Sequence, residues 1–129
     1  MKIQDTIKLT DYKPFPFSIP RVFIDLSIHE NHVQVISTME ILNKNETYTP
    51  LVLNGIDIEI NDIFINQSLL SSEYYEYRNN KLIINKITNE KFELKIKSTI
   101  NPYKNTSLEG LYLSSGMLTS QCEAEGFRR

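Results

Sequence analysis

Apolar and polar residues alternate along much of the chain, and this alternation is typical of half-buried β-strands. It is clearest in residues 22–28 and 33–41, two runs that are separated by the polar stretch 29–32. Successive side chains of a strand point to opposite faces, so Val22 and Ile24 share a face with the later apolar residues of their run. The pattern predicts an antiparallel hairpin with its turn at residues 29–32.

The rest of the chain shows further short, strand-like runs that are separated by turn signals. These runs cover residues 51–53, 56–60, 62–65, 74–78, 82–84 and 92–98. Asn54-Gly55 and Asn79-Asn80 are typical turn residues, and Pro102 interrupts the chain after the last run. Together with the hairpin, the runs predict about seven to nine short strands. The expected fold class is therefore all-β, with antiparallel sheets arranged as a sandwich or as two packed sheets.

Two segments rich in aromatic residues are predicted to pack rather than to bind. Residues 1–20 form a lead-in in which Pro14 and Pro16 oppose a regular ladder or helix. The aromatic residues of this lead-in, expected to lie on a neighbouring surface, are Tyr12, Phe15 and Phe17. The tyrosines of residues 74–78 are likewise expected to be half-buried strand residues rather than a binding patch.

Composition and charge narrow the classes of function. The chain has 129 residues, the size of one domain, and 40% of them are apolar, which is enough for a core. The net charge is −2 and the isoelectric point is near 5.7, so bulk charge does not attract a phosphate backbone. We therefore expect no nucleic-acid partner.

The cellular compartment is predicted from what the sequence lacks. Cys122 is the only cysteine and cannot form an internal disulfide, which favours a reducing compartment. The first residues lack the apolar run of a signal peptide, and no run approaches the ~20 apolar residues of a membrane span. We expect a cytoplasmic protein without a membrane span, in which the N-x-S/T triplets at Asn45, Asn66 and Asn105 are chance occurrences.

Two histidines, His29 and His32, raise the question of a metal site. His29-Glu30 resembles the start of H-E-x-x-H, but Val33 occupies the position of the second histidine. That motif also requires a helix, whereas this pair lies in a predicted turn, so solvated turn residues are the favoured interpretation. The chain shows no G-x-S-x-G motif, no glycine-rich phosphate loop and no zinc-ligand spacing.

The last stretch, residues 107–129, carries the densest set of chemical groups. Glu123 and Glu125 would face the same way on a strand, and Cys122 precedes them. Such a pair serves acid/base chemistry, binds a cation or is simply solvated, and the bare pattern favours solvation. The apolar and glycine residues around Glu123 and Glu125 make it less expected that both carboxylates are simply solvated on the surface. Cys122 has no basic neighbour except Arg128, so we interpret it as an inert thiol.

This stretch resembles the end of a block in the N-terminal domain of aminopeptidase N, a zinc metallopeptidase. The matching residues read LEGLY at 108–112, GM at 116–117 and QCEAEGFRR at 121–129. Weaker matches are DYKP at 11–14, LVLNG at 51–55, INP at 100–102 and NTS at 105–107. They occur in the family's order, so the resemblance covers essentially the whole chain.

The resemblance implies a fold and two site residues. The fold would be the β-rich, saddle-like N-terminal domain, which packs on a thermolysin-like catalytic domain. In the family, the glutamate at the position of Glu123 helps to bind the α-ammonium group of the peptide. The glutamine at the position of Gln121 lines the pocket for the first side chain of the peptide. A carboxylate in a partly dry cleft attracts an ammonium strongly, and fixing the amino terminus places the first peptide bond over the metal. Zinc would polarise that bond and activate water.

The chain also departs from the complete family pattern, because it lacks the H-E-x-x-H helix and the G-A-M-E-N loop. Residues 1–129 are therefore expected to be a partial N-terminal β domain without the catalytic domain, without catalytic residues and without bound zinc. The partners of the parent enzyme would be peptides and its own catalytic domain. Missing strands would leave an unpaired sheet edge that favours self-association. The alternative is a stand-alone β-sandwich binding module without enzyme activity.

Overall fold

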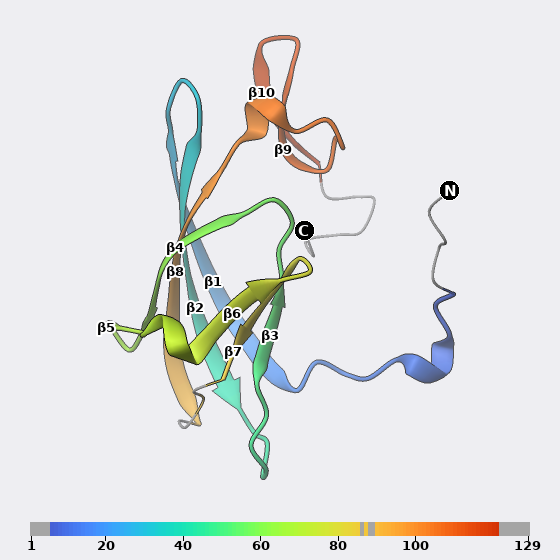
Figure 1. Ribbon diagram of the computed structural model, residues 1–129, viewed down its shortest axis with the longest axis vertical. Helices are drawn as coiled ribbons and strands as arrows, with labels where there is room; N and C mark the ends of the chain where they lie inside the picture. The colour runs from blue at the N-terminus through green and yellow to red at the C-terminus, as the bar shows by residue number, and fades with distance from the viewer. Residues whose placement is uncertain (1–5, 86, 88–89, 122–129) are drawn as a thin grey trace.

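The computed structural model describes residues 6–85, 87 and 90–121, which form antiparallel sheets joined by turns and short 3₁₀ helices (Figure 1). The predicted all-β fold is confirmed. The largest sheet has five strands in the order β1-β2-β8-β4-β5. Its strands are β1 (Phe17–Ile28), β2 (Val33–Asn43), β8 (Lys91–Ile100), β4 (Glu59–Ile65) and β5 (Ser68–Leu69).

Two smaller sheets complete the described part of the fold. The three-stranded sheet has the order β3-β7-β6, and the two-stranded sheet is the β9–β10 hairpin. Their strands are β3 (Leu51–Asn54), β7 (Lys81–Ile84), β6 (Tyr75–Arg78), β9 (Gly110–Ser114) and β10 (Met117–Gln121). The 3₁₀ helices are η1 (Leu9–Asp11), η2 (Ser72–Tyr74) and η3 (Pro102–Lys104).

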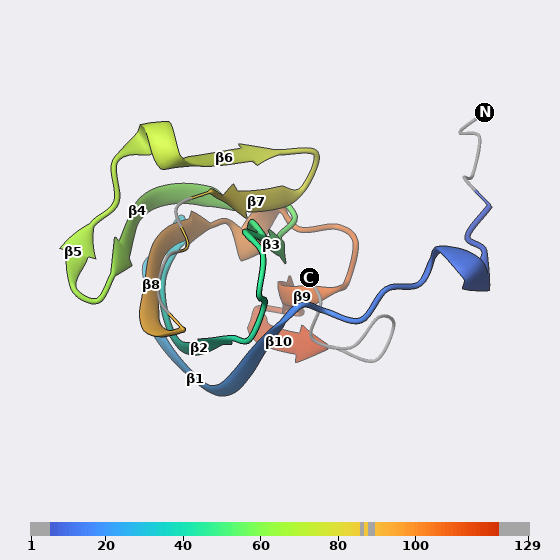
Figure 2. The ribbon, with the colours of Figure 1, turned by 90° about the horizontal axis from the view of Figure 1, so that it is seen from below.

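The hydrophobic core lies between the five-stranded and the three-stranded sheets. Viewed from below, the large sheet curls from β1 through β2 and β8 to β4, and β7 and β3 lie across its concave side (Figure 2). Fully buried side chains come from both sheets and include Ile41, Leu51, Ile63, Ile84 and Leu94. The alternation predicted for residues 92–98 is confirmed, because β8 buries every second residue against this core.

The predicted hairpin is confirmed, and its first strand is longer than expected. Strands β1 and β2 pair antiparallel up to Ile28 and Val33, and the amide of His29 donates to the carbonyl of His32 at 2.9 Å. The prediction that the lead-in extends to residue 20 is wrong, because β1 begins at Phe17. Pro20 is tolerated because β1 lies at the sheet edge and its register with β2 shifts between Ser18 and Arg21.

The turn prediction at Asn79-Asn80 is confirmed, whereas the strand prediction for residues 56–60 is partly wrong. Asn79 and Asn80 both have positive φ, 50° and 59°, and form the two-residue turn between β6 and β7. Residues 56–58 were predicted as strand but precede β4, because Asp57 adopts φ 54°, which interrupts an extended chain.

Of the two predictions about aromatic residues, one is confirmed and the other is mostly wrong. The tyrosines at 74, 75 and 77 pack against the core, as predicted. Phe17 is buried, but Tyr12 is 72% exposed and Phe15 is 48% exposed, so most of the lead-in does not lie on a neighbouring surface. The prolines keep this segment extended, and Figure 1 shows it leading away from the sheets.

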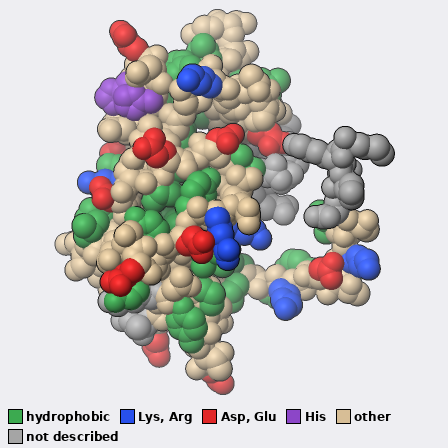
Figure 3. All heavy atoms as spheres, viewed as in Figure 1, with side chains coloured by type: hydrophobic (Ala, Val, Ile, Leu, Met, Phe, Trp, Pro, Cys, Tyr) green, Lys and Arg blue, Asp and Glu red, His purple; other side chains and the backbone are tan. Residues whose placement is uncertain are grey.

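The surface carries both signs of charge. Figure 3 shows acidic and basic side chains interspersed on the face in view, with no large patch of one sign. Within the described ranges, no helix is long and apolar enough to cross a membrane.

Candidate functional site

The β9–β10 hairpin positions the first predicted site residue. Ser115 and Gly116 connect its strands with φ values of 50° and 77°, the left-handed pair that a tight hairpin turn requires. The last pair in the ladder is Gln121 with Gly110, so Gln121 lies at the open end of the hairpin, where it is exposed. In the sequence, Gln121 is followed by the stretch that contains Glu123.

Asn105 holds the loop that leads into this hairpin. Its amide nitrogen donates to the carbonyls of Glu109 and Leu111, both at 2.8 Å. Its amide oxygen accepts from the backbone amide of Ser107 at 3.0 Å and from the Ser107 hydroxyl at 2.7 Å. One half-buried side chain therefore satisfies four polar groups and fixes where β9 begins.

The same loop contains backbone conformations that L-residues adopt only when their surroundings impose them. Leu108 has φ 60° and Gly110 has φ 68°. For Leu108, this conformation costs about 1–2 kcal/mol relative to the right-handed region. The bonds from Asn105 to both sides of Gly110 are the contacts that offset this cost. The chain thus enters β9 through a defined, strained backbone conformation, and β9 pairs with β10, the strand that carries Gln121.

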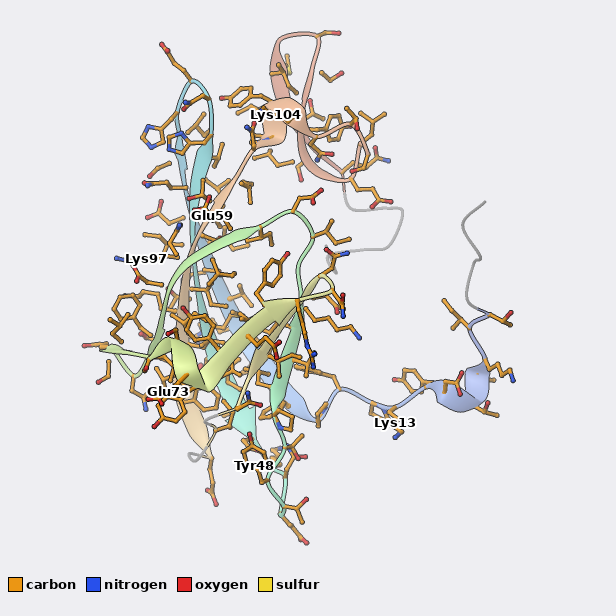
Figure 4. All side chains as sticks on the ribbon, viewed as in Figure 1. Lys13, Tyr48, Glu59, Glu73, Lys97 and Lys104 are labelled. Atoms are coloured by element: carbon orange, nitrogen blue, oxygen red, sulfur yellow. The ribbon has the colours of Figure 1, made fainter. Side chains whose placement is uncertain are left out.

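A second contact joins the hairpin end of the molecule to the tip of β1 and β2. The hydroxyl of Tyr103, in η3, donates to the carbonyl of His29 at 2.6 Å. In Figure 4, Lys104 marks η3 near the hairpin, at the opposite end of the molecule from Tyr48 in the loop after β2. The predicted turn position of both histidines is confirmed, and the rings of His29 and His32 stack with centroids 4.5 Å apart.

The second predicted site residue, Glu123, lies outside the described residues, as do Cys122 and Glu125. Of the two predicted site residues, the structure places Gln121, at the end of β10 and paired with Gly110 of β9. Sequence reasoning missed Asn105 as the organiser of this region. Its position between Pro102 and Ser107 is the signal, because asparagine side chains commonly cap turns of this kind.

All three asparagines of the N-x-S/T triplets make structural hydrogen bonds. Asn45 donates to the carbonyl of Pro16 at 2.8 Å, and the Asn66 side chain accepts from the amide of Glu93 at 2.9 Å. Asn105 forms the network described above. These side chains therefore have a role in the fold that the triplet pattern did not suggest.

A shallow depression of about 450 Å³ lies elsewhere, on the outer face of the large sheet. Its charged lining includes Glu40 and Lys91, and Lys91 Nζ lies 2.7 Å from Glu40 Oε1. The hydrogen bond and charge of Lys91 hold the pKa of Glu40 below its ordinary value. The lining also contains Arg21 and Glu93, so it carries two basic and two acidic side chains and does not present charge of one sign. In the part of the chain that is described, no three His, Cys, Asp or Glu side chains are grouped to hold a metal ion.

Solved structures define the class of protein to which this fold belongs. Aminopeptidase A of Legionella pneumophila matches 95% of this chain with a TM-score of 0.83 and 27% identity, and the match covers 15% of that protein. An M1 zinc metallopeptidase from Deinococcus radiodurans shares the fold over 88% of this chain and 28% of its own, with a TM-score of 0.68 at 14% identity. The fold is that of the N-terminal β domain of M1 aminopeptidases.

Curated relatives identify the family. Aminopeptidase N of Caulobacter vibrioides is 34% identical over 122 residues, which are 95% of this chain and 14% of that protein. Aminopeptidase N of Escherichia coli is 32% identical over 118 residues, 92% of this chain and 13% of that protein. No protein-family model matches the sequence.

The chain thus belongs with aminopeptidase N, and it spans about one seventh of the length of the curated relatives that it matches. This agrees with the family resemblance seen in the sequence motifs. The alternative, a stand-alone β-sandwich binding module, is not favoured by these relatives.

Proposed function

We propose that this chain is part of the N-terminal domain of a zinc aminopeptidase that removes amino-terminal residues from peptides. The supporting observation is the β9–β10 hairpin, which ends at Gln121 at the start of the QCEAEGFRR run. An exopeptidase must distinguish a free amino terminus from an internal residue, and the motif supplies a carboxylate for that purpose. The catalytic domain of the same enzyme would be the partner of this domain, in the cytoplasm.

In this proposal, Glu123 binds the α-ammonium group of the substrate, and Gln121 lines the pocket for the first side chain. Attraction between an ammonium and a carboxylate grows as water is excluded, so the pair selects free amino termini. Holding that end fixes the position of the first peptide bond relative to the catalytic groups.

Zinc belongs to the proposed enzyme as a whole. The described residues do not fit a zinc site, since they contain no group of three or more potential ligands. We therefore assign to this chain substrate binding and no step at the metal. The purified 129-residue chain is expected not to hydrolyse alanyl-p-nitroanilide with or without added zinc, and zinc-dependent release of nitroaniline would contradict this assignment.

The first test is to read the open reading frame beyond Arg129. We expect it to continue into sequence that encodes G-A-M-E-N and then H-E-x-x-H. A stop codon directly after Arg129 would favour the binding module instead.

The second test is Glu123→Gln in the enzyme with its catalytic domain. Loss of the ammonium partner should lower kcat/KM for free-amino substrates by about 100-fold, equivalent to roughly 3 kcal/mol. Glu125→Gln removes the same charge two residues away and is the matched control, expected to have a much smaller effect. Equal kcat/KM for wild type and Glu123→Gln would remove Glu123 from the site.

A further inference from the structure

Strand β1 carries the largest group of exposed apolar side chains of any strand that the structure describes. β1 is the edge strand of the five-stranded sheet, so only β2 pairs with it among the described strands. Its apolar side chains are unusually exposed for strand residues: Val22 49%, Phe23 64%, Ile24 64%, Leu26 45% and Ile28 59%. A long apolar edge of this kind is a template for pairing with another strand.

Exposure on both faces of β1 indicates the kind of contact that would cover it. Val22 and Ile24 lie on the inner face, opposite Met39 and Ser37 of β2, whereas Phe23 lies on the outer face. A layer packed on one face would leave the other face exposed. A strand added to the edge covers part of both and also satisfies the outward N–H and C=O groups.

The charged residues of β1 favour a second copy of β1 as the strand that pairs with this edge. Arg21 and Asp25 lie on the same face, two positions on either side of Phe23. When two copies of β1 pair antiparallel about a two-fold axis at Phe23, Arg21 of each copy lies opposite Asp25 of the other. Symmetric registers centred on Arg21 or Asp25 would instead oppose like charges, and those centred on Val22 or Ile24 would leave both charges without a cross-strand charge partner.

This arrangement differs from the usual protection of an edge strand, in which charged residues repel a second copy. Here the two charges are of opposite sign and are spaced to attract a second copy in one register. The central pairs would be Val22 with Ile24 on the inner face and Phe23 with Phe23 on the outer face.

We propose that two copies of this chain associate through β1 in this register, which joins their five-stranded sheets into one ten-stranded sheet. The contact is isologous, so each charge pair occurs twice. The ladder is short, because the register shift near Pro20 ends it, so the dimer forms only at high protein concentration. The inference does not depend on the peptidase assignment, because its test measures mass and cross-linking rather than hydrolysis.

Sedimentation equilibrium of the 129-residue chain over a range of concentrations tests the association. Arg21→Glu and Asp25→Lys should each weaken the dimer by about tenfold, because each replaces two attractive pairs with two repulsive ones. An equimolar mixture of the two variants should recover wild-type affinity, because the heterodimer restores both attractive pairs. A wild-type chain that stays monomeric, or a mixture no tighter than the single variants, would overturn the proposal.

Two controls separate this effect from a change in folding. Lys95→Glu reverses a charge in the central strand β8 and should leave the dimer affinity unchanged. Arg21 lies opposite Glu40 within the chain, whereas Asp25 lies opposite Ile36, so Asp25→Lys changes no charge pair across β1 and β2. Matching thermal unfolding of all variants at low concentration shows that the monomer fold is retained.

Cysteine cross-linking in a Cys122→Ser background tests the register. Directly opposed residues of an antiparallel pair have Cα atoms about 4.5–5.5 Å apart, within the range of a disulfide. Phe23→Cys should therefore form a cross-linked dimer under mild oxidation. Ser27→Cys is the matched control, because its two copies would lie about 27 Å apart in this register. Equal cross-linking at both positions would overturn the register.

Discussion

Two regions of the five-stranded sheet, its covered centre and its β1 edge, are built from the same alternating pattern but are covered very differently. Near β7 and β3, the inner face is closed by a second sheet, and Leu94 and Ile41 are fully buried. Along β1, the same inner face carries Ile24 at 64% exposure and Leu26 at 45%. Alternation therefore specifies which face of a strand is apolar, whereas burial depends on whether another element lies over that face.

The covered centre of the large sheet and the β9–β10 hairpin also differ in what holds them in place. The covered centre is stabilised by apolar burial, which is not directional. The hairpin region is held by hydrogen bonds from Asn105 and Tyr103. Directional bonds fix the position of a strand more sharply than apolar contact alone, which suits a segment that presents Gln121.

The largest effect is expected from the same substitution made at the covered centre of the sheet and at its β1 edge. Leu94→Ala removes a fully buried side chain and should lower the free energy of unfolding by about 3 kcal/mol. Leu26→Ala, on the same inner face but half exposed, should cost less than about 1 kcal/mol. Urea unfolding of both variants at low protein concentration measures the difference. Equal losses would show that β1 is covered in solution even in the monomer.

A smaller effect is expected when the directional bonds are removed. Asn105→Asp keeps the acceptor for Ser107 but loses both donors to Glu109 and Leu111, and should cost about 2 kcal/mol. The measurement is urea unfolding, together with amide hydrogen exchange in β9. Asn45→Asp is the control: it also loses two donated bonds, to the Pro16 carbonyl and to the Asn43 side chain, but these do not hold the entry of a strand and should be worth less. If both variants unfold like wild type, apolar contacts and not Asn105 hold the hairpin.

The smallest effect is expected in how stability depends on pH through the Glu40–Lys91 pair on the outer face. Lys91 lowers the pKa of Glu40 in the folded state, so the ionised Glu40 side chain stabilises the fold. This contribution to the free energy of unfolding is complete above the ordinary pKa of a glutamate, and it is lost as the pH falls through the lowered pKa. Wild type should therefore lose a little more stability than Glu40→Gln between about pH 7 and pH 3. Urea midpoints at several pH values check this. Parallel pH curves for the two proteins would show that the exposed pair contributes nothing.

Much of the fold follows from local sequence. The hairpin of β1 and β2, the strand β8 and the Asn79-Asn80 turn follow from period-2 alternation and from residues that tolerate positive φ. The errors have local causes that pattern does not reveal: a bulge that admits Pro20 into β1, and a left-handed Asp57 that delays β4.

For the candidate site, the family resemblance and the motif follow from the residues alone, since a run such as QCEAEGFRR is specific without any structure. Only the tertiary structure showed that Gln121 ends a hairpin, that Asn105 holds its entry and that β1 is exposed on both faces. The physical reason is distance along the chain. Alternation and turn residues act between neighbours, whereas burial and the Tyr103–His29 bond join segments that lie far apart in sequence.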